Sequence, residues 1–397
     1  MKVEELKYII QSAHVNFLYG SGVSRPYLVT LGNIEEYLTK LEKDDSLSDD
    51  VYYVVRASLY KAYCDGVISP NYIFPRSDTN FLATQTAYND FFHIWNDIIN
   101  KRSSLLLEKQ VNLFTTNIDL LVEDTLSNSG LELNDGFRGT LNPTFNETNF
   151  QISLSKSSMQ YHKAAEIPVF NLIKIHGSEN WEAQDNTICS NKYRCGRIKE
   201  LLSKIPTNYF VSLTKNDPNG NKVDKTFHEL VDDAGKIKLT SSDIFNDFFK
   251  EYDQIVMINP TKEKFKTSVM DYHFYELMRI YSNALERENS VLFVMGFSFA
   301  DEHLAQLTKR AAATNPTLQV IIFAFSDNDK DKYLRNLGIT GKGGNNNSAI
   351  ITPTDFKREN NSTDKKHEDL CKEIDYFDLS TINLVFDTIA ASIHSSI

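Results

Sequence analysis

Short apolar runs that end in small or polar residues recur along the chain. They cover residues 15–19 before GSGVS, 111–114 before TTNID, 170–175 before HGSENW, 254–258 before NPTK, 291–295 before GFSFAD, and 318–325. Runs of this length are typical of parallel strands buried on both faces. Phe274, Met278, Tyr281 and Leu285 recur at helical spacing between two of these runs, which predicts a β-α-β unit.

The segments between the runs indicate how the chain is organised. Residues 51–110 are aromatic and free of strand signals, so they predict a helical insertion after the first strand. Residues 180–252 are more polar and predict a second, weaker insertion. Residues 338–368 are rich in Gly, Asn and Lys, which predicts a mobile surface segment before a C-terminal helix. The sequence therefore predicts an α/β fold, with a parallel sheet and helical insertions.

Composition excludes several classes of protein. The 397 residues carry 42 Lys and Arg against 53 Asp and Glu, a net charge of −11, which argues against direct binding of nucleic acid or of an anionic membrane. The longest apolar stretch, residues 291–300, is well short of the ~20 residues that span a bilayer. The N-terminal residues lack the layout of a signal peptide, so we expect a cytoplasmic protein. The four cysteines contain no C-x-x-C pair, so no zinc is expected.

The first loop follows residues 15–19 and contains Gly20, Ser21, Gly22 and Ser24. Glycines let the backbone approach a ligand closely, and N–H groups near a following helix would hold a pyrophosphate. A tight turn is an equally good interpretation, because the full dinucleotide fingerprint is missing.

The second loop contains Thr116, Asn117 and Asp119 at a strand end. Asn and Asp are common turn formers and helix caps, and capping explains Asp119 better than Asn117. The third loop places His176 beside Gly177 after an apolar strand. A lone histidine is more often structural than catalytic, but its position at a strand end favours function.

Two later loops carry Asn259 and the pair Gly296 and Ser298. Each is compatible with ordinary turn chemistry. Five strand ends bearing such residues would, however, lie at one edge of a parallel sheet, where open α/β sheets bind their ligands.

Together GSGVS, TTNID, IKIHGS, INPTK and GFSFADEH resemble the nucleotide-binding core of the sirtuin-like proteins, and more narrowly the sirtuin-like NADases of bacterial antiphage defence. The resemblance implies a Rossmann-like, NAD-binding domain over residues 1–340, followed by residues 341–397. It implies Asn117 and His176 as the catalytic pair, with Asp119 third. The pyrophosphate would lie on residues 20–24, and the adenosine half against Gly296, Ser298 and Asn259.

The resemblance also implies a reaction and partners. Water would cleave NAD to nicotinamide and ADP-ribose, with Asn117 orienting the ribose and His176 accepting a proton. Short members of the family work beside a HerA-type hexameric ATPase, so such a partner and a homo-oligomer are expected. Two alternatives remain: a sirtuin-type protein deacylase or ADP-ribosyltransferase, which the missing zinc cysteines disfavour, and a catalytically silent NAD or ADP-ribose sensor.

Overall fold

A computed structural model describes residues 1–29, 33–102, 107–160, 163–184, 187–257, 268–338, 347–361 and 365–394. Its centre is a seven-stranded sheet in which all neighbouring strands pair in parallel. The strands, in spatial order, are β16 (Ser348–Ile351), β15 (Gln319–Phe323), β14 (Ser290–Met295), β1 (His14–Tyr19), β2 (Gln110–Thr115), β8 (Val169–Lys174) and β3 (Glu132–Asn134). The predicted α/β fold with a Rossmann-like parallel sheet is therefore confirmed.

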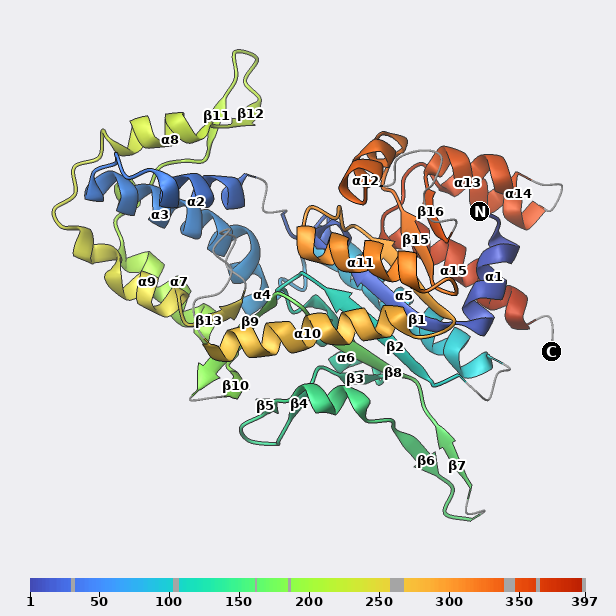
Figure 1. Cartoon of the computed structure of the whole chain (residues 1–397). Helices are drawn as coiled ribbons and strands as arrows, with labels where there is room; N and C mark the ends of the chain where they lie inside the picture. Colours follow the sequence, from blue (N-terminus) through green and yellow to red (C-terminus); the bar gives the residue numbers. More distant parts are fainter. Residues whose placement is uncertain are drawn as a thin grey trace.

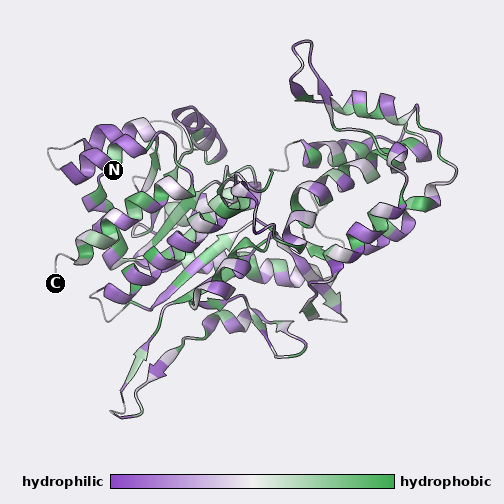
Figure 2. Ribbon diagram, turned by 180° about the vertical axis from the view of Figure 1, so that it is seen from behind, coloured by the Kyte–Doolittle hydropathy of each residue, from purple (hydrophilic) through white to green (hydrophobic). Residues whose placement is uncertain are grey.

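Helices cover both faces of this sheet (Figure 1). One face packs against α1 (Val3–Ser12), α5 (Thr79–Lys101), α6 (Leu121–Ser129), α13 (Pro353–Asn360), α14 (Lys365–Glu373) and α15 (Leu379–His394). The other packs against α10 (Ser268–Glu286), α11 (Glu302–Thr314) and α12 (Lys330–Asn336). Successive side chains of a strand point to opposite faces of the sheet, so each strand contributes to both cores. Phe17, for example, belongs to the first cluster and Leu18 to the second. Figure 2 shows green along much of the central sheet, and green alternating with purple along the helices.

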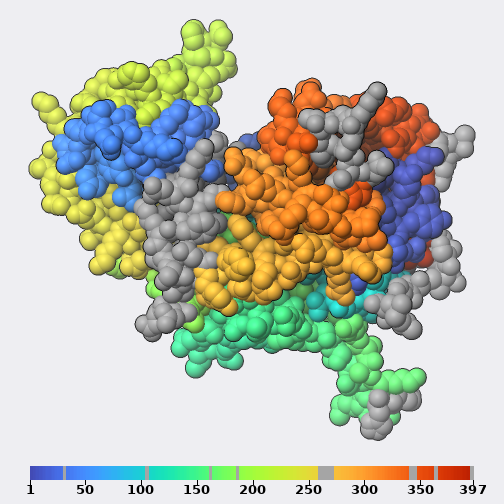
Figure 3. Space-filling view, viewed as in Figure 1, coloured from blue at the N-terminus to red at the C-terminus, as the bar shows by residue number. Residues whose placement is uncertain are grey.

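A separate helical lobe stands beside the sheet domain (Figure 3). It is built from α2 (Ile34–Lys43), α3 (Asp49–Tyr63), a π-helical turn (Cys64–Ile68), α4 (Ser69–Tyr72), α7 (Arg194–Lys204), α8 (Phe227–Ala234) and α9 (Asn246–Tyr252). Its buried residues form a cluster of their own, in which Tyr60 stacks on Tyr252 with ring centroids 4.1 Å apart. Helix α5 packs instead on α15 and the sheet, through Phe92 and Trp95 among others. The segment 51–110 thus contributes to both parts of the molecule.

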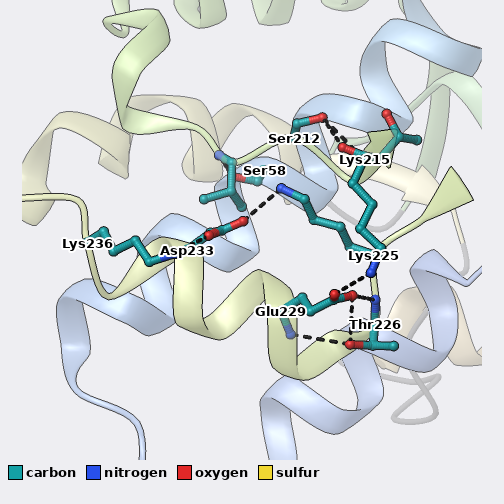
Figure 4. A network of polar contacts seen from close by, with 10 residues as sticks. Ser58, Ser212, Lys215, Lys225, Thr226, Glu229, Asp233 and Lys236 are labelled. Atoms are coloured by element: carbon teal, nitrogen blue, oxygen red, sulfur yellow. Dashed lines mark hydrogen bonds and ion pairs between the residues drawn. The ribbon is translucent and has the colours of Figure 1, made fainter. Parts of the chain in front are cut away.

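A polar network fixes the hairpin of β11 (Thr214–Asn216) and β12 (Lys222–Asp224) to α8 (Figure 4). Lys225 Nζ lies 2.8 Å from a carboxylate oxygen of Asp233, and Lys215 pairs with Glu229. Thr226 caps α8, because its side chain accepts from the Glu229 N–H while Glu229 accepts from the Thr226 N–H at 2.9 Å. These groups are partly exposed to water, so each ion pair contributes little stability, and the apolar cluster holds the lobe together.

A second sheet links the lobe to the core. Its strands, in order, are β13 (Ile255–Met257), β9 (Gly177–Gln184), β10 (Thr187–Ser190), β5 (Thr144–Phe145) and β4 (Phe137–Arg138). The prediction that residues 254–258 form a parallel strand, and with α10 a β-α-β unit, is wrong, because β13 pairs antiparallel with β9 outside the central sheet. A short apolar run does not distinguish the two kinds of strand. The stripe of Phe274, Tyr281 and Leu285 on α10 is confirmed as buried.

The remaining segments are short. A ribbon of β6 (Ser155–Ser157) and β7 (Ala164–Glu166) projects from the body of the molecule (Figure 1). Single 3-10 turns cover Ser21–Ser24, Glu147–Gln151, Thr207–Tyr209, Ser242–Phe245 and Asp327–Asp329. Within the polar stretch after residue 338, β16 forms the edge of the sheet and Phe356 of α13 is buried. In the described ranges, every helix is too short or too polar to cross a membrane.

Four asparagines form a ladder across the parallel sheet. Asn16, Asn112, Asn171 and Asn134 lie at the same level of β1, β2, β8 and β3. The side-chain amides link at 2.9 Å between Asn112 and Asn16, 3.0 Å between Asn171 and Asn112, and 3.0 Å between Asn134 and Asn171. A slip of any strand would leave buried amides unpaired, so the ladder fixes the register of these strands.

Replacing Asn171 with alanine should therefore be costly. The side chain is 1% exposed, and it donates to Gln110 and Asn112 and accepts from Asn134. We expect Asn171→Ala to lower the free energy of unfolding by about 2–4 kcal/mol, measured by urea denaturation. Asn128→Ala, at an exposed helical asparagine, should cost less than about 0.5 kcal/mol. Equal losses in the two variants would contradict a role for the ladder.

Candidate functional site

The carboxyl ends of β1 and β14 meet through glycines. The Gly20 N–H donates to the Met295 carbonyl at 3.3 Å, and the Gly22 N–H donates to the Gly296 carbonyl at 3.1 Å. Gly296 has a φ of 58°, and a Cβ on it would lie 2.6 Å from the Val23 nitrogen. Only glycine fits such a close approach. Glycine is therefore required between β1 and β14, the point in the sheet at which the strand order reverses.

The same contact changes the interpretation of the first loop. Besides the two glycine amides, the Val23 N–H donates to the Gly20 carbonyl at 3.2 Å. Three of the loop's N–H groups therefore hold the protein itself together and are not available to a pyrophosphate in this conformation. Ser21, in contrast, is exposed.

Asn117 holds the first loop from the neighbouring strand end. Its Nδ2 donates to the Gly20 carbonyl at 3.2 Å and to Ser24 Oγ at 3.1 Å, and its own N–H donates to Thr115 Oγ1 at 2.9 Å. The side chain is 8% exposed. Asn117 thus orders the loop as well as lying at the site, and a substitution would disturb both.

Asp119 lies deeper, beneath the same loop. Its carboxylate accepts from Ser24 Oγ at 2.9 Å and from the Leu121 N–H at 3.2 Å. Burial raises the pKa of Asp119, while the Lys174 ammonium and these hydrogen bonds act in the opposite direction. The geometry favours a role in holding the loop at the start of α6.

His176 lies at the turn between β8 and β9. Its Nε2 is 3.0 Å from Asp301 Oδ2, while Asp301 Oδ1 caps α11 by accepting from the His303 and Leu304 N–H groups at 2.9 and 3.0 Å. The next residue, Gly177, has a φ of 78°, and a Cβ there would lie 2.2 Å from the Val256 carbonyl oxygen. The His176 side chain is 18% exposed, so a ligand at the strand ends can reach it.

The structure brings some of the predicted site residues into contact and leaves others apart. Hydrogen bonds and close contacts join Gly20, Gly22, Ser24, Asn117, Asp119 and Gly296. Thr116 and Ser298 are half-buried at the same strand ends, and the Ser298 carbonyl accepts from Asn336 at 2.7 Å. No hydrogen bond between His176 and Asn117 occurs within the described part of the chain. Asn259 lies outside the described residues.

Sequence reasoning missed three charged residues at this site. Lys174 is 3% exposed and its Nζ donates to the Asp119 carbonyl and, at 2.9 Å, to Ser178 Oγ. Glu179 is fully buried, and neither carboxylate oxygen has a hydrogen-bond partner of ordinary geometry among the described residues, although the weak thiol donor of Cys195 lies beside it. Asp301 pairs with His176. The lysine inside the apolar run VFNLIKIHG could have indicated a buried functional residue from the sequence. The contact of Asp301 with His176 could not, because it joins segments that are distant in the sequence.

The fold and the site are those of the Rossmann-like class, in which ligands bind at the carboxyl ends of parallel strands. A family model described as SIR2-like domain matches residues 231–341, and this match supports a sirtuin-like family and NAD-related activity in general. The matched span contains Gly296 and Asp301 but neither Asn117 nor His176. A search of curated proteins found no match. Across the described ranges, no group of three or more His, Cys, Asp or Glu side chains is placed to hold a metal ion.

Buried Glu179 makes the stability of the protein depend on pH. Burial and the neighbouring Asp119 and Glu123 raise its pKa well above the ordinary 4.5, against the effect of Lys174. The folded state thus retains a proton that the unfolded chain loses, so this contribution is complete below about pH 4.5 and falls as pH rises toward the folded pKa. We expect Glu179→Gln, which cannot ionise, to raise the melting temperature relative to wild type more at pH 8 than at pH 5.

The exposed Glu4→Gln serves as the control for this comparison. Its difference from wild type should be small and similar at both pH values. A Glu179→Gln protein whose difference from wild type is the same at pH 5 and pH 8 would contradict the assigned pKa direction.

Proposed function

We propose that this protein is an NAD glycohydrolase that cleaves NAD into nicotinamide and ADP-ribose. The observation that carries the proposal is the partly exposed His176 imidazole, which Asp301 holds at the sheet edge beside the joined loops of β1 and β14. The SIR2-like match supports NAD as the substrate class.

The chemistry follows from the bond that breaks. The ribose–nicotinamide bond cleaves with its electron pair moving to the positively charged nicotinamide ring, which leaves neutral, and the sugar gains oxocarbenium character. The oxygen of a water molecule bonds to that sugar carbon, and the water's proton passes to a base. An ionised Asp301 only accepts hydrogen bonds, so His176 Nε2 carries a hydrogen toward it and Nδ1 is left to accept the proton.

The other strand ends supply positioning. Asn117 would orient the ribose and the attacking water from the end of β2, and holding reactants at near-attack distance lowers the barrier substantially. We assign three polar groups to nucleotide binding: exposed Ser21 and half-buried Thr116 and Ser298. Most N–H groups of the first loop already donate hydrogen bonds within the protein.

The decisive experiment incubates the purified chain with NAD, alone and together with a HerA-type ATPase, and separates the products by chromatography. Free nicotinamide and ADP-ribose in equal amounts support the proposal. Binding of NAD without any product would favour a silent sensor, and product formation only with an acylated peptide would favour a deacylase.

His176→Ala should abolish most of this activity. Loss of a general base lowers rates by about 10²–10⁴-fold, while the fold and much of the NAD affinity should persist. Nicotinamide release per folded molecule is the measurement, with folding checked by thermal melting. His228→Ala, at an 85% exposed histidine of the lobe, is the matched control and should retain wild-type turnover. Near-normal release by a folded His176→Ala protein would exclude the assigned role.

We further propose that the enzyme is a homo-oligomer whose activity depends on a HerA-type ATPase, and that NAD depletion serves antiviral defence. Unregulated NAD hydrolysis would drain the host, so restraint is required. The β6–β7 ribbon supports an interaction role, because all residues of β6 are exposed and a lone two-stranded ribbon is marginally stable in water.

Light scattering and turnover test this dependence. We expect a mass above that of one chain, and nicotinamide release at least tenfold faster with the partner ATPase than without it, since the partner must bind the active form more tightly to shift the population. An unrelated hexameric ATPase should have no effect. A monomer with full activity alone would refute the dependence.

A further inference from the structure

Two loops of the site are joined along their backbones. The Ile175 N–H donates to the Thr115 carbonyl at 2.9 Å. Beyond His176, the Glu179 N–H and Ser178 Oγ both donate to the Ile118 carbonyl at 3.2 Å. The loop that carries Asn117 and the turn that carries His176 therefore form one connected unit, although no side-chain hydrogen bond links those two residues among the described residues.

Lys174 is the charged centre of this unit. Its Nζ donates to the Asp119 carbonyl and to Ser178 Oγ, and forms an ion pair with Glu123 of α6. An ammonium has three N–H donors. Three partners from the Asn117 loop, from β9 and from α6 therefore account for its whole donor capacity.

The surrounding charge keeps this lysine in place. Asp119 and Glu179 are buried and the Glu123 side chain is 20% exposed. Desolvation raises the pKa of each carboxyl group, while the Lys174 ammonium lowers each one. Lys174 is thus the positive charge that all three carboxyl groups face, and its direct ion-pair partner is Glu123. Three acidic side chains around one lysine are not explained by stability alone. Replacing a buried ion pair with well-packed apolar side chains is often neutral or stabilising.

We propose that Lys174 is a positioning residue for NAD cleavage: its ammonium fixes the Asn117 loop against the His176 turn and so sets the geometry between ribose, water and base. This inference rests on the proposed NAD glycohydrolase function. A displacement of about 1 Å between such groups costs on the order of 10²-fold in rate, while substrate binding through the rest of the nucleotide is little affected. The signature is therefore a loss in kcat with KM nearly unchanged.

The variant that tests this is Lys174→Met/Glu123→Gln. Removing the lysine alone leaves Glu123 without its ion-pair partner and endangers folding. The double variant removes both members of the ion pair and loses the contacts to the Asp119 carbonyl and Ser178. Glu123→Gln alone is the matched control, because it breaks the ion pair but leaves those two contacts in place.

We expect kcat for nicotinamide release to fall roughly 10- to 100-fold in the double variant, with KM for NAD within about threefold of wild type. Glu123→Gln should stay within about threefold of wild type in both constants. A double variant that folds and matches the Glu123→Gln protein in kcat would overturn the positioning role.

Amide hydrogen exchange provides a readout that needs no turnover. In the double variant, exchange should accelerate about tenfold at residues 116–121, relative to Glu123→Gln, and remain unchanged in β1. A uniform acceleration across the sheet would indicate lost global stability and would also overturn the proposal. Should wild type release no nicotinamide, the proposed function fails, and with it the catalytic role of Lys174, whereas the exchange result still decides whether Lys174 fixes the loop.

Discussion

The register of four parallel strands is the constraint on which the site depends. Asn16, Asn112, Asn171 and Asn134 occupy one level of β1, β2, β8 and β3, and each buried amide finds its partner only in that register. Hydrophobic residues alone specify register weakly in a sheet covered on both faces, because a slipped strand would still bury apolar side chains. A slip would, in contrast, orphan amides that cost about 1–3 kcal/mol each. The ladder therefore fixes where these four strands end relative to one another.

Strand ends that are aligned in this way bring distant segments into contact. Gly20 and Gly22 meet Gly296 without side chains between them, and Asn117 reaches across to the Gly20 carbonyl. His176 reaches Asp301, whose second oxygen starts α11. Each group therefore serves two purposes, since the residues that would act on a ligand also hold the loops. Activity and local order should consequently respond together to substitution of Asn117, and more independently to substitution of His176, whose contacts are fewer.

The sequence predicts the sheet well and the site in part. Five of the six apolar runs lie in the central sheet, because buried parallel strands leave a strong pattern of consecutive apolar residues. β13 departs from that pattern because its few residues divide between two cores: Val256 packs against the sheet while Ile255 and Met257 pack against the lobe. The recurrence of V-N and F-N in three strands was visible in the sequence, but amide pairing between strands depends on an unknown spatial order. Contacts such as His176–Asp301 and Lys174–Glu123 likewise depend on tertiary structure alone.

The helical lobe is connected to this site through β9. The strand begins at Gly177, directly after His176, and pairs with β13, whose Ile255 and Met257 belong to the lobe's core. Cys195 of α7 donates to the Glu179 carbonyl at 3.7 Å, and Ile118 of the Asn117 loop also packs in the lobe cluster. Gly177 packs so closely against Val256 that even a Cβ would not fit between them. The His176 turn and β13 are therefore in tight contact. A rotation of the lobe relative to the sheet must therefore either break the β9–β13 pairing or move the His176 turn with it. The position of the lobe and the geometry of the site are consequently coupled.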